Sequence, residues 1–120
     1  MLLNAPRATE IMASRKLDGL VALVPYNVHY VSGFWSQIMQ AGFDATQAVV
    51  LPRNDRAPTI LVCPAFDLRS MINADPDVDE VVAYTSPGAD GAGTDYAGWP
   101  TRQGVPLSER QQRWISETAQ

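Results

Sequence analysis

The chain offers few side chains of the types that carry nucleophilic or metal chemistry. It has one histidine, His29, and one cysteine, Cys63, among 120 residues. A structural zinc site generally takes four nitrogen or sulfur ligands, so these two residues do not make one. A Cys/His nucleophile pair is formally possible, but Cys63 ends an apolar run, where cysteine usually packs as a small hydrophobe. We expect His29 to be exposed or hydrogen-bonded in a short helix, Ser32 to be no nucleophile, and the chain to hold neither a catalytic residue nor a metal site.

Two further segments have some features of ligand-binding loops. The acidic run 75–80 begins like a calcium loop, but an EF-hand needs glycine at its sixth position, and that position is Glu80. The run 88–94 is rich in glycine, but a phosphate loop needs a following lysine and the start of a helix. We therefore expect a solvated turn at 75–80 and a flexible loop at 88–94.

The elements that must position any site follow from hydrophobic patterning and from turn residues. One short helix, Val28–Ser32, is expected within the segment 25–35. Continuous apolar runs predict strands, and runs with helical spacing predict helices. The predicted strands are Leu20–Val24, Gln47–Leu51, Thr59–Cys63 and Val78–Tyr84, and the predicted longer helices are Pro6–Lys16, Ala65–Asn73 and Ser108–Ala119.

This alternation predicts an α/β fold of one domain over residues 1–120. The polar turn 52–58 predicts an antiparallel hairpin, so the sheet is expected to be mixed, mostly parallel, with helices on both faces. The uninterrupted apolar run Leu20–Val24 predicts a strand covered on both sides. The chain ends on a helix where another strand is due, so we expect it to be a piece of a longer protein.

The segment Thr85–Leu107 changes in composition to glycine, proline, aspartate and threonine. It has no hydrophobic period and is long for a loop inside a compact domain, so it is either functional or mobile. We expect residues 88–104 to be mobile or held by contacts outside the core. Tyr96 and Trp99 are the large aromatic residues in this stretch, and they are candidates to anchor it.

Charge and hydropathy limit the partners. The net charge is −4, and the nine basic residues form no stripe, which argues against a nucleic-acid partner. No apolar stretch approaches the roughly 20 residues that cross a membrane, and no signal peptide is visible. A single cysteine fits a reducing compartment. These features predict a cytoplasmic domain without a membrane partner.

The most informative motif is the segment 25–35. Asn27 is a good helix N-cap, and Gly33 suits the left-handed residue that ends a helix. The spacing predicts one helical turn or slightly more, with Val28 and Val31 pointing inward and Phe34 and Trp35 thrown outward.

This motif, in its context, resembles the N-terminal domain of the creatinase/prolidase family. The resemblance rests on a helix that contains Met12, on Leu17–Leu23, and on Asn27, Tyr30 and Gly33 with their neighbours. It covers residues 6–84 well and the final helix loosely, while Thr85–Leu107 is longer than the family's usual connection. The family includes Xaa-Pro dipeptidases, aminopeptidases P and creatinase.

The resemblance implies a ribonuclease H-like fold without catalytic carboxylates. It implies that two divalent metal ions (Mn, Co or Zn) are held by a C-terminal domain that is absent here, so this chain alone is expected to be inactive. It also implies a homodimer in which this domain walls the active-site entrance for a small peptide or zwitterionic substrate. The expected parent is an Xaa-Pro dipeptidase-like hydrolase, or within the family a creatinase-like or other small C–N hydrolase. A free-standing α/β ligand-binding or interaction module remains the alternative, and a downstream reading frame carrying the family's metal ligands would decide.

Large apolar residues are grouped after the motif. One interpretation is a hydrophobic cover over the sheet; the other is an exposed rim that contacts a dimer mate or substrate, since aromatic residues and methionine favour interfaces. The resemblance favours the rim, with Trp35 as the first candidate. The predicted contact residues are Phe34, Trp35, Met39 and Phe43, with Ile38 in the same segment.

Overall fold

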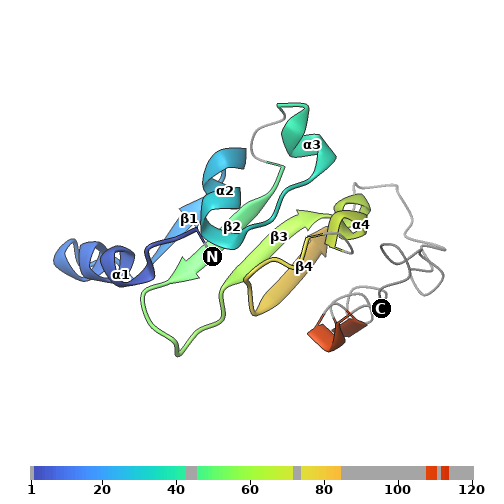
Figure 1. Cartoon of the computed structure of the whole chain (residues 1–120). Helices are drawn as coiled ribbons and strands as arrows, with labels where there is room; N and C mark the ends of the chain where they lie inside the picture. Colours follow the sequence, from blue (N-terminus) through green and yellow to red (C-terminus); the bar gives the residue numbers. More distant parts are fainter. Residues whose placement is uncertain (1, 43–45, 72–73, 85–107, 111, 114–120) are drawn as a thin grey trace.

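The structure is a computed structural model that describes residues 2–42, 46–71, 74–84, 108–110 and 112–113. Its centre is a four-stranded sheet with the spatial order β1-β2-β3-β4 (Figure 1). The strands are β1 (Gly19–Ala22), β2 (Ala48–Pro52), β3 (Ile60–Pro64) and β4 (Glu80–Tyr84). The predicted order of strands along the chain is confirmed, and the predicted segment Thr85–Leu107 lies outside the described residues.

The sheet is mixed, as expected. β2 pairs antiparallel with both β1 and β3, whereas β4 runs parallel to β3. The hairpin predicted from the polar turn is therefore confirmed. The expectation that most neighbouring strands are parallel does not hold for the described strands, because β2 runs against both of its neighbours. The ribonuclease H-like arrangement stays a prediction.

The first helix begins at a residue that caps it. α1 (Ala5–Ser14) starts at Asn4, whose side-chain oxygen accepts a hydrogen bond from the Arg7 N–H at 3.1 Å. Such a cap satisfies a backbone donor that has no partner inside the helix. The other helices are α2 (Pro25–Ser32), α3 (Gln37–Gln40) and α4 (Leu68–Met71), with a short 3-10 turn, Ala65–Asp67, before α4. In the expected last helix, residues 109–110 and 112–113 are helical and the remainder lies outside the described residues.

One face of the sheet carries the core. The register places Val49 beside Leu61 and Leu61 beside Val81, so these side chains share a face. Helices α2, α3 and α4 pack on this face through the same buried cluster. α1 lies on this side as well, because it lines a groove together with α2 and with Leu20, Val49 and Leu51. The core cluster consists of Val28, Phe34, Met39, Val49, Leu61, Cys63, Leu68, Met71, Val78 and Val81.

The opposite face is much less covered. The alternation of side chains puts Val21, Val50, Ile60, Val62 and Val82 there. Val21 is 61% exposed and Val82 is 48% exposed, and none of the five is buried. The expectations of helices on both faces, and of a first strand covered on both sides, are therefore not met by the described residues. The physical reason is that α2, α3 and α4 pack on the same side, through the core cluster.

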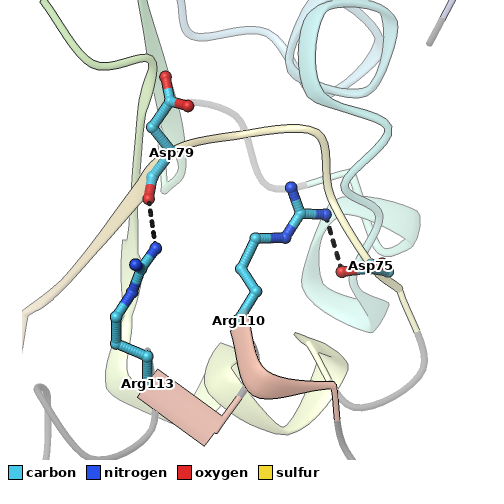
Figure 2. Close-up of polar contacts among 4 residues, drawn as sticks. All are labelled: Asp75, Asp79, Arg110 and Arg113. Atoms are coloured by element: carbon cyan, nitrogen blue, oxygen red, sulfur yellow. Dashed lines mark hydrogen bonds and ion pairs between the residues drawn. The ribbon is translucent and has the colours of Figure 1, made fainter.

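The described part of the C-terminal helix is tied to the loop before β4. Figure 2 shows Arg110 reaching the Asp75 carboxylate at 2.9 Å and Arg113 donating to the backbone oxygen of Asp79 at 3.4 Å. Both contacts lie at the surface, where one ion pair is worth about 1 kcal/mol or less. The Asp79 side chain accepts a hydrogen bond from the Thr59 N–H at 2.7 Å. In the run 75–80 the four acidic residues are exposed, as expected for a solvated segment, whereas Pro76 and Val78 are buried.

Candidate functional site

The turn after α2 is fixed by two small residues. Gly33 ends the helix in the left-handed region, at φ 74°, and its N–H donates to the His29 carbonyl at 2.7 Å. The buried Ser32 hydroxyl donates to the Val28 carbonyl at 2.7 Å and accepts from the Phe34 N–H at 3.1 Å. The predicted helix end at Gly33 is confirmed. Ser32 works as a structural bridge across the turn.

The predicted cap at the other end of α2 is wrong. The helix starts at Pro25, and its N-cap is Val24, which makes no side-chain cap bond. Proline suits the first helical position, since its fixed φ matches the helix and its missing N–H has no partner there anyway. The helix therefore starts three residues earlier than expected, at Pro25 instead of Val28, and Asn27 becomes an exposed residue inside its first turn. Tyr30, which completes the motif with Asn27 and Gly33, is 45% exposed. Its hydroxyl oxygen lies 3.5 Å from the backbone nitrogen of Asn4.

The predicted contact residues separate into different environments. Phe34 is fully buried, and Met39 is 2% exposed; both belong to the core cluster. The expectation that Phe34 points outward is therefore wrong, because the turn at Ser32 and Gly33 directs the chain back over the sheet. Trp35 is partly buried against the core, and Phe43 lies outside the described residues. Of the described candidates for a rim, Trp35 and the partly buried Ile38 retain exposed surface.

Trp35 belongs to an aromatic cluster with two side chains of α2. Its ring lies 5.5 Å from the ring of His29, edge to face at 75°, and 5.9 Å from the ring of Tyr26, tilted by 41°. Both separations fall in the range of favourable ring pairs. His29 Nδ1 lies 3.3 Å from the Phe34 carbonyl, so a proton on Nδ1 completes a hydrogen bond there. Tyr26 is 76% exposed, and the cluster therefore presents aromatic surface to solvent.

Tyr26, His29 and Tyr30 were not singled out as a set from the sequence. They occupy positions i, i+3 and i+4 of α2, so they share one side of the helix. That spacing was available in the sequence, but locating it on the helix required the earlier start at Pro25. Trp35 reaches Tyr26 and His29 only through the turn at Gly33, and these three residues form the aromatic cluster.

A buried polar network lies next to Trp35. The Ser36 hydroxyl caps α3 by accepting from the Met39 N–H at 3.3 Å, and it also lies 3.4 Å from Gln47 Nε2. Gln47 Nε2 in turn donates to the Asp67 carboxylate. The three polar side chains are 2–3% exposed. They connect the start of α3, the entry to β2 and the 3-10 turn that follows β3, and so hold the segment that carries Trp35.

Burial sets the electrostatics of this network. It raises the pKa of Asp67, while hydrogen bonds from Gln47 and Ser36 oppose the rise. Burial and the nearby Asp67 raise the pKa of the Cys63 thiol to about 12. A thiol with that pKa stays protonated near neutral pH and is a poor nucleophile. Cys63 is thus a packing residue, as its place at the end of an apolar strand indicated.

The described residues do not fit a metal centre. Within the part of the chain that the structure describes, no three His, Cys, Asp or Glu side chains are grouped so that they could hold an ion. His29 is engaged with Trp35 and Phe34, and Cys63 is buried elsewhere in the core. Among the described helices, none is long and apolar enough to cross a membrane.

Comparison with known proteins adds one positive result. The family described as Creatinase/Prolidase N-terminal domain matches residues 6–113, which is most of the chain. No curated protein and no solved structure gives a match. The match includes the Gly33 turn, the aromatic cluster and the polar network beside it. The chain therefore belongs to the Creatinase/Prolidase N-terminal domain family.

Proposed function

We propose that this chain is the non-catalytic N-terminal domain of a dimetal hydrolase of the Xaa-Pro dipeptidase type. In this proposal it helps to form a homodimer and supplies part of the rim of the active site. Family membership over residues 6–113 is the observation that carries the proposal. The two divalent metal ions would be held by another domain of a longer protein, since the described residues here offer no set of ligands for them.

The aromatic cluster is the part of the domain best suited to the rim. Tyr26 is largely exposed, Trp35 is half-buried, and His29 packs between helix and turn. Aromatic side chains provide a large contact area with few rotatable bonds, which favours binding of flat or apolar groups. The proline ring of an Xaa-Pro dipeptide is such a group. The polar network behind Ser36 holds this surface in place.

The test is Trp35→Ala in the full-length enzyme. We expect kcat/KM on Xaa-Pro dipeptides to fall about tenfold, equivalent to about 1.4 kcal/mol, with little change in melting temperature. The loss follows from removing aromatic contact area at the substrate entrance while leaving the core cluster intact. Steady-state kinetics and thermal melts measure the two effects separately.

Phe66→Ala is the matched control, because Phe66 is an aromatic residue that is 61% exposed and lies outside the cluster. It should leave both activity and melting temperature nearly unchanged. A large fall in melting temperature for Trp35→Ala, with unchanged activity per folded molecule, would make Trp35 an ordinary core residue.

One observation favours the second candidate, a free-standing ligand-binding module. A groove of about 400 Å³ runs between α1, α2 and the first two strands. Its walls are mostly apolar, with Asn27 and Tyr30 among its few polar groups. Sites for small ligands commonly have this composition. Saturable binding of a small molecule by the isolated chain, abolished by a bulky substitution at Ala8 in the groove, would favour this candidate.

A further inference from the structure

Among the described residues, the outer edge of β1 has backbone N–H and C=O groups without a hydrogen-bond partner. β1 lies at the end of the sheet, so β2 is its neighbour on one side (Figure 1). Just before β1, the Asp18 carbonyl accepts from the Arg53 N–H at 2.9 Å. In an antiparallel ladder every second residue exchanges such bonds with the partner strand. The N–H and C=O groups of Leu20 and Ala22 therefore also point toward β2. The N–H and C=O groups of Gly19 and Val21 are therefore directed away from the sheet.

The side chains at this edge are apolar and exposed. Leu20 is 41% exposed, Val21 61% and Leu23 48%. No charged residue occurs between Gly19 and Leu23. Exposed edge strands are usually protected by charged side chains, proline or a bulge, because they otherwise pair with another chain. This edge has none of these within the strand. α1 flanks it across the groove that Val21 also lines, and in the described structure the outward backbone groups make no hydrogen bond.

We propose that β1 pairs antiparallel, edge to edge, with β1 of a second copy of this chain, about a two-fold axis at Val21. In this arrangement the outward N–H and C=O of Val21 meet the same groups of the second copy. Gly19 meets Leu23 of the second copy, the residue that follows β1. The result is one sheet that continues across both copies.

Three properties favour an identical partner over an unrelated one. First, the pairing is self-complementary, as a two-fold interface requires, since each outward group finds its counterpart in the same segment. Second, it sets the large Leu20 opposite the small Ala22 of the second copy, and both line the groove beside α1. Third, the uncharged segment brings no like charges together.

The inference deepens the proposed function, on whose homodimer it rests, by naming the surface that joins the two copies. Trp35 lies in the connection between α2 and α3, so the rim and the edge of β1 use different residues. A stable interface generally buries about 800 Å² on each partner. One short strand provides less, so the dimer of the isolated chain should dissociate on dilution.

The test is sedimentation velocity of the 120-residue chain over a wide concentration range, with Val21→Pro as the main variant. Proline lacks an N–H, and at Val21 the lost group is the one that points away from β2, so the β1–β2 ladder is kept. We expect the wild type to pass from monomer to dimer as concentration rises. Val21→Pro should need at least a tenfold higher concentration to do so.

Val21→Lys provides an independent variant in case proline disturbs folding. It places a charge at an exposed position of the edge and should weaken dimerisation to a similar extent. Val82→Lys is the matched control: Val82 is an exposed valine on the same face of the sheet but in β4. It should dimerise like the wild type, and so should Trp35→Ala.

Each remaining outcome overturns the edge pairing. A wild type that stays monomeric throughout shows that the edge does not pair. Equal dimerisation of the wild type and of folded Val21 variants shows that another surface is used. Loss of the dimer in Val82→Lys assigns association to the open face of the sheet, and loss in Trp35→Ala assigns it to the rim, as in the proposed function.

Discussion

The two faces of the sheet differ in burial although their side chains are nearly the same. Val81 and Val82 are neighbours in β4; the first is 8% exposed and the second 48%. Val49 in β2 is fully buried, whereas Val21 in the adjacent strand is 61% exposed. The covered face is packed by α2, α3 and α4, together with Phe34 from the turn after α2, and α1 borders it across a groove. Valine and leucine content therefore does not decide which face forms the core; the direction taken by the connecting helices does.

The aromatic rim depends on the covered face. The turn at Gly33 buries Phe34, and the next residue, Trp35, is left at the boundary with solvent. Behind it, Ser36 is held by Gln47 and Asp67, both buried on the same side. The open face has no comparable polar network among the described residues. We therefore expect substitutions of fully buried residues on the covered side to affect stability strongly, those on the open face to have little effect on it, and those at the outer edge of β1 to affect association.

The largest expected effect is that of Phe34→Ala. Removing a fully buried aromatic side chain should cost about 3–5 kcal/mol in free energy of unfolding, because it loses transfer energy and leaves a cavity. Phe66→Ala, at an exposed position, should cost much less than this. Urea denaturation followed by circular dichroism measures both. Equal midpoints for the two variants would mean that Phe34 lies at the rim after all.

A smaller effect tests the faces directly within one strand. Val81→Ala should cost about 1.5 kcal/mol for the two carbon atoms removed from the core, and somewhat more if a cavity remains. Val82→Ala should change the free energy of unfolding by about 0.5 kcal/mol or less, as is usual at exposed positions. The same urea measurements on dilute protein, where association is weak, make the comparison. A cost at Val82 as large as at Val81 would show that the open face is covered in the folded chain.

Local sequence patterns were sufficient to predict much of the fold. The apolar runs at β2, β3 and β4 were bounded by turn residues, and the polar segment 52–58 indicated the hairpin. Gly33 was identified as the helix end because few other residues adopt positive φ without strain. Family membership could be inferred from the same motif.

The errors arose where local and tertiary signals compete. Asn27 is a good cap in isolation, but Pro25 offers an earlier helix start and takes the first helical position. The uninterrupted run Leu20–Val24 has no alternation, so it could not show that one side of β1 lies open. The network of Ser36, Gln47 and Asp67 joins residues 11 and 20 positions apart, and no spacing rule brings them together in advance.

The last prediction concerns Asp67, the buried carboxylate of the covered side. Because burial raises its pKa, the folded chain holds this proton at pH values where the unfolded chain has already lost it. The folded state then binds more protons than the unfolded state, so the contribution of Asp67 to stability falls as pH rises. The fall begins near the ordinary aspartate pKa of about 3.9 and is complete once pH exceeds the raised pKa.

Asp67→Asn removes this ionisation while keeping an oxygen that can accept from Gln47. The free energy of unfolding of the wild type minus that of Asp67→Asn should therefore decrease as pH rises from about 3.9 and then become constant. Urea denaturation at closely spaced pH values measures this difference. Gln47→Leu removes a donor that favours the charged carboxylate, so it should extend the decrease to higher pH. A difference that does not vary with pH would mean that Asp67 titrates alike in the folded and unfolded chain, and that the covered side is more hydrated around Ser36 than its burial indicates.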